Sequence, residues 1–189
     1  MDAEYAKGLG GDPTAVIAAI FERQKAFAEH AFDQLDDAGF FRILAPGLNS
    51  VAIIARHVAG NLTSRWTDFL TTDGEKPTRN RDAELTALDP EAGARSAIRV
   101  GIMRDWEAGW STLFATLGTL SANDLNRTVL IRSKPHTAFA AALRQVDHYS
   151  FHAGQINMIA RQIVGTHNWQ WFTVPPGGSG ELNRRLMGG

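Results

Sequence analysis

Apolar residues recur at helical intervals in four long stretches of the chain, and polar segments separate them. The first stretch covers residues 11–35, where Asp12 is suited to cap a helix and Pro13 to occupy its first position. Its apolar residues fall on one side of the predicted helix, as expected of a core-facing surface. They are Ile17, Ile20, Phe21, Phe27, Ala31 and Leu35.

The second and third stretches have the same helical period. The second begins after Asn49 or Ser50, either of which is a good cap, and continues over residues 51–70. The third covers residues 94–120, and two of its glycines, Gly101 and Gly109, weaken the helix locally but could permit close packing. Its apolar positions are Ile98, Ile102, Trp106, Leu113 and Leu117. The polar connection over 72–92 is long for a compact domain, which indicates a functional segment, a partner contact or mobility.

The run Thr128–Ile131 is β-branched and predicts a short strand or an extended crossover. The fourth helix is expected to start near Thr137 and to end at Gly165. Together these patterns predict an all-α fold, a four-helix bundle with a long crossover and a short extended segment before the last helix. We expect one domain over residues 1–189, with residues 178–189 as a flexible tail.

Composition narrows the range of functions. The chain carries 19 basic and 20 acidic residues without a long block of either sign, which argues against nucleic acid as the main partner. No apolar run reaches the roughly 20 residues of a membrane-spanning helix, so no membrane association is expected. The polar start lacks the features of a secretory signal, and we expect a cytoplasmic protein. Cysteine is absent, so any thiol must arrive with a substrate.

Two histidines, His148 and His152, lie four residues apart in the fourth helix. Because a helix advances about 100° per residue, their imidazoles share one face and lie about 6 Å apart along the axis. Spacing alone leaves two interpretations open, a metal site or two histidines on a common helix face. A catalytic zinc-type site normally takes three protein ligands. His57, surrounded by apolar residues in the second helix, is the best candidate for the third, because burying it without a partner would be costly.

Other residues near the histidines are candidates for supporting roles. Asn61 lies one turn after His57, and Gln155 lies on the face of the histidine pair, so either could orient an imidazole, touch a substrate or satisfy a buried neighbour. Three arginines could bind an acidic group, although solvated charges or dimer contacts explain them equally well: Arg65, Arg79 and Arg81. Three other histidines lack a partner at ligand spacing: His30, His136 and His167. Three tryptophans at helical intervals are expected in the core or an interface: Trp66, Trp106 and Trp110.

The absence of several motifs argues against some well-known reaction classes. Tyr149 follows His148, so the HExxH general base of a zinc metalloprotease is missing. The chain also contains no Gly-rich phosphate loop and no serine nucleophile elbow, which leaves nucleotide and acyl-serine chemistry unsupported.

Residues 50–85 together with residues 132–172 resemble the DinB/YfiT-like superfamily of metalloenzymes, in particular an uncharacterised bacterial branch of it. The resemblance covers most of the chain and implies a four-helix bundle, often dimeric, in which one histidine of the second helix and an HxxxH pair of the fourth bind a divalent metal. Carried over by motif, the ligands are His57, His148 and His152. The tail departs from the family, because "PPGG" stands where a basic residue is expected after the proline.

The resemblance implies a divalent-metal-dependent enzyme that takes a small-molecule substrate and forms a homodimer. Zinc and nickel suit imidazole ligands best, and iron, cobalt and manganese are also compatible. Relatives include thiol S-transferases and a thiol-dependent isomerase, so the open metal position is expected to activate a low-molecular-weight thiol. Two alternatives remain open at this point. One is a metal-dependent amide or ester hydrolase that activates water; the other is a non-catalytic, metal-stabilised dimeric binding protein, which would need no general base.

Overall fold

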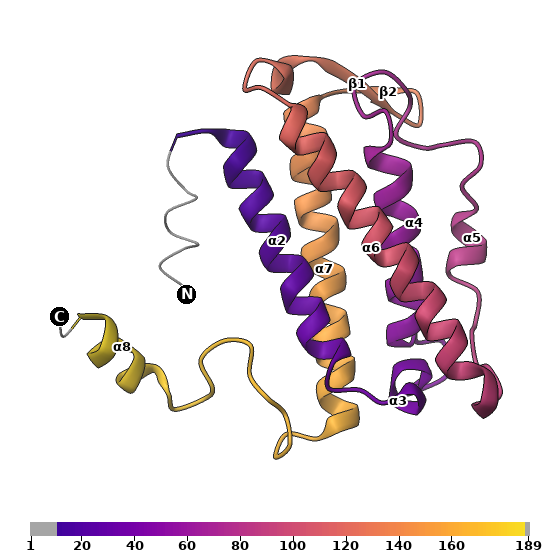
Figure 1. Ribbon diagram of the computed structural model, residues 1–189, viewed down its shortest axis with the longest axis vertical. Helices are drawn as coiled ribbons and strands as arrows, with labels where there is room; N and C mark the ends of the chain where they lie inside the picture. Colours follow the sequence, from indigo (N-terminus) through magenta and orange to yellow (C-terminus); the bar gives the residue numbers. More distant parts are fainter. Residues whose placement is uncertain (1–10, 188–189) are drawn as a thin grey trace.

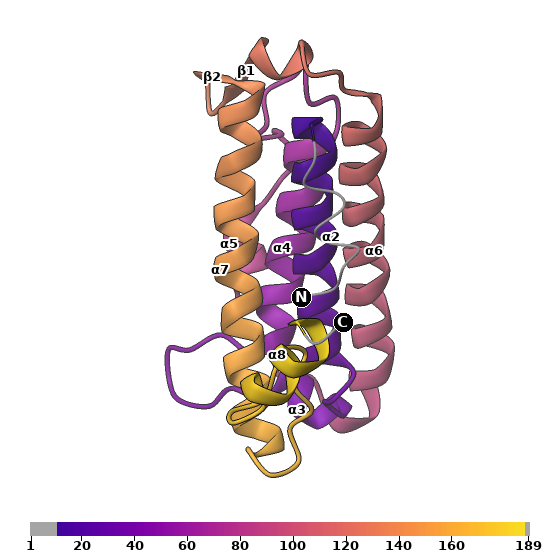
Figure 2. The same ribbon diagram turned by 90° about the vertical axis from the view of Figure 1, so that its left-hand side faces the viewer.

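Four long helices run side by side along the length of the molecule (Figures 1 and 2). They are α2 (Pro13–Phe32), α4 (Val51–Trp66), α6 (Arg95–Thr119) and α7 (Ala138–Val164). The computed structural model describes residues 11–187; residues 1–10, on which the expectation of a missing secretory signal depends, and residues 188–189 lie outside it. Helix α4 packs mainly against α6, and α2 packs mainly against α7. The predicted all-α bundle is confirmed.

The helix ends follow from local sequence. The side chains of Asp12, Ser50 and Thr137 each accept a hydrogen bond from a main-chain N–H in the first turn of α2, α4 and α7. Ser50 rather than Asn49 is therefore the cap of α4. Gly165 ends α7 with φ of 83°, a conformation that favours glycine.

Helix α4 ends four residues earlier than the apolar pattern predicts. Thr67 is extended and Asp68 has φ of 49°, so the helical hydrogen bonding stops after Trp66. Phe69 remains buried beyond this turn and stacks on Trp66 at 4.9 Å between ring centroids. The pattern could not locate the end because Phe69 is apolar and buried in a turn as it would be in a helix.

The connections contain shorter elements. Helix α3 (Asp37–Phe41) follows α2, and α5 (Arg81–Glu84) lies within the long connection between α4 and α6. Single 3-10 turns cover Ala92–Ala94 and Asp124–Asn126.

A two-stranded antiparallel hairpin precedes α7. Strand β1 (Thr128–Ile131) pairs with β2 (Lys134–Thr137), so the strand alternative for residues 128–131 is the one adopted. Both residues of the turn, Arg132 and Ser133, have positive φ, and their N–H groups donate to the Asp73 carboxylate at 2.8 and 2.6 Å. The sequence did not predict β2, because Pro135 lowers its strand propensity and only pairing with β1 fixes it.

Aromatic side chains fill the centre of the bundle. Trp66, Trp106 and Trp110 are almost fully buried, and Phe21 and Tyr149 pack against them. The tryptophans therefore belong to the core, one of the two roles that their spacing predicts.

Of Gly101 and Gly109 in α6, one permits close packing. A Cβ atom on Gly109 would lie 2.8 Å from the Cβ of Leu62, so glycine at this position lets α4 and α6 approach. Gly101 meets nothing within 4 Å, and close packing does not explain it.

The C-terminal segment crosses the end of the bundle before leaving it. Phe172 packs on Phe27 at 5.3 Å between centroids, and the Arg161 guanidinium lies 4.5 Å from the ring centroid of Trp171. Residues Ser179–Met187 then form helix α8, which lies beside the bundle rather than within it (Figure 1). The sequence assigned no helix to this segment. Within residues 11–187, none of the helices combines the length and apolar character that crossing a bilayer requires.

Candidate metal centre

Three histidines from two helices meet between α4 and α7. His57 projects from α4, and His148 and His152 project from successive turns of α7. The Nε2 atom of His148 lies 3.4 Å from that of His57 and 3.2 Å from that of His152. One ring nitrogen from each residue can be chosen so that all three lie within 4.8 Å of one another. The sequence-predicted ligand set is thus brought together at one point.

Two of the three distances between these nitrogens fit tetrahedral coordination of a metal ion. In tetrahedral coordination with metal–nitrogen bonds of about 2.0–2.1 Å, two ligand nitrogens are about 3.3–3.4 Å apart. The separations of 3.4 and 3.2 Å are close to that value. His57 is buried, whereas His148 and His152 are half-buried.

The partners of the Nδ1 atoms explain why the Nε2 lone pairs of His57 and His152 point to one position. Nδ1 of His57 lies 2.9 Å from Oε2 of Glu84, and Nδ1 of His152 lies 2.8 Å from Oε1 of Gln155. A carboxylate and an amide oxygen can only accept, so both Nδ1 atoms donate, and each neutral ring presents an Nε2 lone pair to the shared point. His148 can offer one proton to these two lone pairs at most. A cation satisfies the arrangement better than protons do.

Burial keeps two of these imidazoles neutral. It lowers the pKa of His148 to about 3, and the nearby His152 and His57 act in the same direction. It lowers the pKa of His152 to about 4, against a hydrogen bond with Gln155 that raises it. Because metals bind the neutral imidazole, both rings are in the ligating form at neutral pH.

Glu84 is a member of the centre that sequence reasoning did not find. Burial alone would raise its pKa, but hydrogen bonds with Arg79 and His57 outweigh burial and lower the pKa to about 2. The carboxylate is therefore ionised, and Arg79 holds it through two hydrogen bonds of 2.8 Å. No periodic pattern pointed to Glu84; the only signal was the unusual length of the 72–92 connection.

The two candidate supporting residues differ in what they contact. Gln155 touches His152 as described, and its amide orients that ring. Asn61 instead accepts a hydrogen bond of 3.0 Å from the Tyr149 hydroxyl, which in turn accepts from Trp66 Nε1 at 3.3 Å. Asn61 therefore lies in a buried polar network of the core, beside the centre.

The three arginines that the sequence analysis named also differ in burial and in their partners. Arg65 is buried and donates to the Gly74 carbonyl and to Glu75, while Arg79 is buried against Glu84. Arg81 is half-exposed and lies 4.0 Å from the fully exposed carboxylate of Asp82. Only Arg81 of these three retains an accessible guanidinium.

The remaining histidines lie outside the cluster. Nε2 of His30 contacts the Gln170 carbonyl at 2.7 Å, Nδ1 of His136 contacts the Lys134 carbonyl at 2.9 Å, and His167 is exposed. Within the described part of the chain, the only group of three or more metal-ligating side chains is the one formed by His57, His148 and His152.

Comparison with known proteins shows the family of the chain. A family model described as "Protein of unknown function (DUF1572)" matches residues 14–178, which is most of the chain. This family is generally grouped with DinB/YfiT-like proteins, in agreement with the resemblance carried by the histidine motif. No curated protein and no solved structure matches the chain.

Proposed function

Because the chain belongs to the DUF1572 family, whose function is undefined, we propose from the site itself that it is a divalent-metal-dependent enzyme of DinB/YfiT type. The observation that supports the proposal most directly is the convergence of three imidazoles whose Nε2 lone pairs face one point. We propose His57, His148 and His152 as the ligands and Gln155 as a residue that orients one of them. Zinc or nickel is the preferred ion, because imidazole suits both.

A divalent ion held by three neutral imidazoles would supply Lewis-acid activation of a molecule at the position the histidines leave open. The protein's own contribution is to fix the three rings. His57 and His152 each hold a proton at Nδ1 through Glu84 and Gln155, which keeps Nε2 free.

We favour a thiol over water as the activated molecule. Among the described residues, the carboxylate in contact with the cluster is that of Glu84, and its ion pair with Arg79 and pKa of about 2 make it a poor proton acceptor. A thiol, with a free pKa of about 8.5, needs less help to ionise than water does. The chain has no cysteine of its own, which is consistent with a thiol cosubstrate. We therefore propose an S-transferase-like reaction.

The first test is the metal content of the purified protein, compared with that of the His148→Ala variant. We expect about one divalent ion per chain in the parent and a large loss in the variant, because one of three ligands is removed. His167→Ala is the matched control, since this exposed histidine lies outside the cluster. Absence of metal from the parent after incubation with zinc, nickel or cobalt would contradict the proposal.

The second test addresses the reaction. Small thiols such as cysteine and glutathione are mixed with a chromogenic aryl halide. As the new carbon–sulfur bond forms, the aryl group loses its halide and the proton of the thiol passes to solvent. We expect turnover that requires metal and is lost in His148→Ala. Metal-dependent hydrolysis of a nitrophenyl ester without thiol turnover would favour the hydrolase instead. A protein that binds metal and catalyses neither reaction would support a binding role.

A further inference from the structure

The connection between α4 and α6 crosses the surface of α4 at Gly60. A Cβ atom on Gly60 would lie 2.7 Å from Cδ of Glu84, closer than real Cβ contacts. Even alanine at this position would therefore force the carboxylate to move. Glycine in the interior of a helix is destabilising relative to alanine, so its presence here indicates that the space is used.

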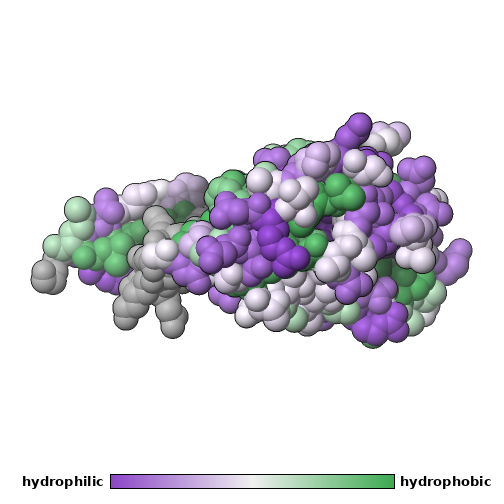
Figure 3. Space-filling view, turned by 90° about the horizontal axis from the view of Figure 1, so that it is seen from above, coloured by the Kyte–Doolittle hydropathy of each residue, from purple (hydrophilic) through white to green (hydrophobic). Residues whose placement is uncertain are grey.

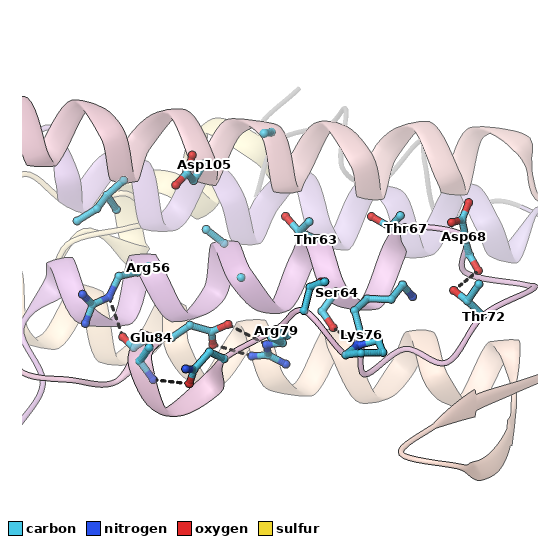
Figure 4. A pocket seen from close by; sticks show the side chains of 18 residues that line it. Arg56, Thr63, Ser64, Thr67, Asp68, Thr72, Lys76, Arg79, Glu84 and Asp105 are labelled. Atoms are coloured by element: carbon cyan, nitrogen blue, oxygen red, sulfur yellow. Dashed lines mark hydrogen bonds and ion pairs between the residues drawn. The ribbon is translucent and has the colours of Figure 1, made fainter.

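Glu84 is fixed from several sides in that space. Its oxygens accept two hydrogen bonds from Arg79, and one of them also contacts Nδ1 of His57 at 2.9 Å. Figure 4 shows Glu84 and Arg79 pointing toward one another between the connection and α4. The short helix α5 that carries Glu84 is capped by Asn80, whose Oδ1 accepts from the N–H of Ala83 at 2.9 Å.

The carboxylate is also a boundary of a groove. This groove, about 990 Å³ in volume, lies between α4, α6 and the connection, and its lining includes Glu84 and Arg79 but none of the three histidines (Figure 4). The Glu84–Arg79 pair thus separates the groove from His57. Both side chains are nearly buried, with 11% and 4% exposure, so water is largely excluded from the ion pair.

We propose that Glu84 is a positioning residue of the metal centre. The absence of a side chain at Gly60 leaves the space, here called the notch, in which the Glu84 carboxylate reaches His57. Glu84 fixes the tautomer and orientation of His57 and strengthens its Nε2 as a metal ligand, as carboxylates do for metal-bound histidines in general. The 72–92 connection is thereby part of the centre, although it supplies no ligand. This inference rests on the proposed metal-dependent function.

A purely mechanical role for the same contacts is distinguishable. The connection is attached to α4 independently of the carboxylate, because Nε of Arg56 donates to the main-chain carbonyl of Glu84 at 2.8 Å. Loss of the carboxylate therefore leaves this attachment in place. If Glu84 only fastened the connection, its removal would change stability but not the metal's environment.

The test is a double-mutant cycle on metal affinity with Gly60→Ala, Glu84→Ala and the double variant. Zinc affinity of the metal-free proteins is measured by competition with a chromogenic chelator. We expect each single variant to bind about 10- to 100-fold more weakly. Because both changes remove the same contact, the double variant should bind no more weakly than Glu84→Ala alone. Gly101→Ala is the matched control, since nothing lies within 4 Å of its new Cβ.

A spectroscopic measurement covers the case in which an alanine variant fails to fold. Glu84→Gln keeps the shape of the side chain and removes its charge, and its fold is checked by the helical circular dichroism signal. We expect the visible absorption of its Co²⁺ form to differ from that of the parent, which a purely mechanical role would not produce.

The outcomes separate this inference from the proposed function. Parental affinity and an unchanged Co²⁺ spectrum in the Glu84 and Gly60 variants, with binding abolished in His148→Ala, would overturn the role of Glu84 and leave the metal centre standing. Additive effects of Gly60→Ala and Glu84→Ala on zinc affinity would contradict the proposal that Gly60 makes room for the Glu84 carboxylate. A parent protein that binds no ion would overturn the proposed function itself.

Discussion

At the scale of single residues, chemically identical imidazoles acquire different roles from the partners of their ring nitrogens. His30 contacts a main-chain carbonyl and stays outside any cluster. His57 and His152 have side-chain acceptors at Nδ1, which direct Nε2 toward His148. Burial, rather than these contacts, disfavours the imidazolium forms of His148 and His152, and neutral rings are the form that a metal cation binds.

This burial predicts a pH dependence of stability in the metal-free protein. The pKa values of His148 and His152 fall from 6.5 to about 3 and 4 on folding, so below about pH 6.5 the unfolded chain binds more protons than the folded one. The free energy of unfolding should therefore decrease as the pH falls from about 6.5 to 4.5, measured by urea denaturation after chelation. The His148→Asn, His152→Asn double variant should lose much of this slope. An equal slope in both proteins would show that other groups cause it.

At the scale of elements, the bundle depends on a close approach of α4 to α6. Gly109 allows it, since a Cβ there would meet Leu62 at 2.8 Å and the Ala59 carbonyl at 3.2 Å. His57 lies on the same helix as Leu62, and α4 also contacts α7, which carries the other two histidines.

Replacing this glycine should test the packing. Gly109→Ala is expected to lower the free energy of unfolding by about 1–3 kcal/mol, the usual cost of overpacking a core contact. Gly101→Ala, on the same helix but facing open space, should instead raise it by up to about 1 kcal/mol through helix propensity. Urea denaturation of both variants gives the comparison. Similar stabilisation of both would contradict tight packing at Gly109.

At the scale of the whole molecule, polar side chains predominate over the bundle on the face shown in Figure 3, and apolar ones form small separate areas. Helix α7 differs in that four large apolar side chains along it are substantially exposed: Phe139, Leu143, Phe151 and Met158. The ring centroid of Phe151 lies 5.2 Å from that of His152, so this surface adjoins the histidine cluster. The expected homodimer stays a prediction, and α7 is the surface on which we place it.

The dimer prediction is tested by light scattering coupled to size-exclusion chromatography. We expect the parent to have twice the mass of the chain and the Leu143→Glu, Met158→Glu double variant to be monomeric, because charges at a buried apolar interface are costly. Val100→Glu, at an exposed apolar position of α6, is the control and should leave the mass unchanged. A monomeric parent would contradict the prediction.

The sequence by itself determined the type and order of the long elements. Helical periodicity and side-chain caps are local properties, so Asp12, Thr137 and Gly165 marked ends that the structure retains. The spacing of His148 and His152 likewise placed two imidazoles on one face without any knowledge of the fold.

Only the tertiary structure decided which distant groups meet. The end of α4 at Trp66, the pairing of β2 and the contact of Glu84 with His57 all depend on segments far apart in the chain. Such contacts leave no periodic trace in the sequence, because a side chain in an irregular connection has no helix or strand to give its direction. The convergence of His57 with the pair on α7 was a hypothesis from sequence, and the packing of the two helices provided the geometry.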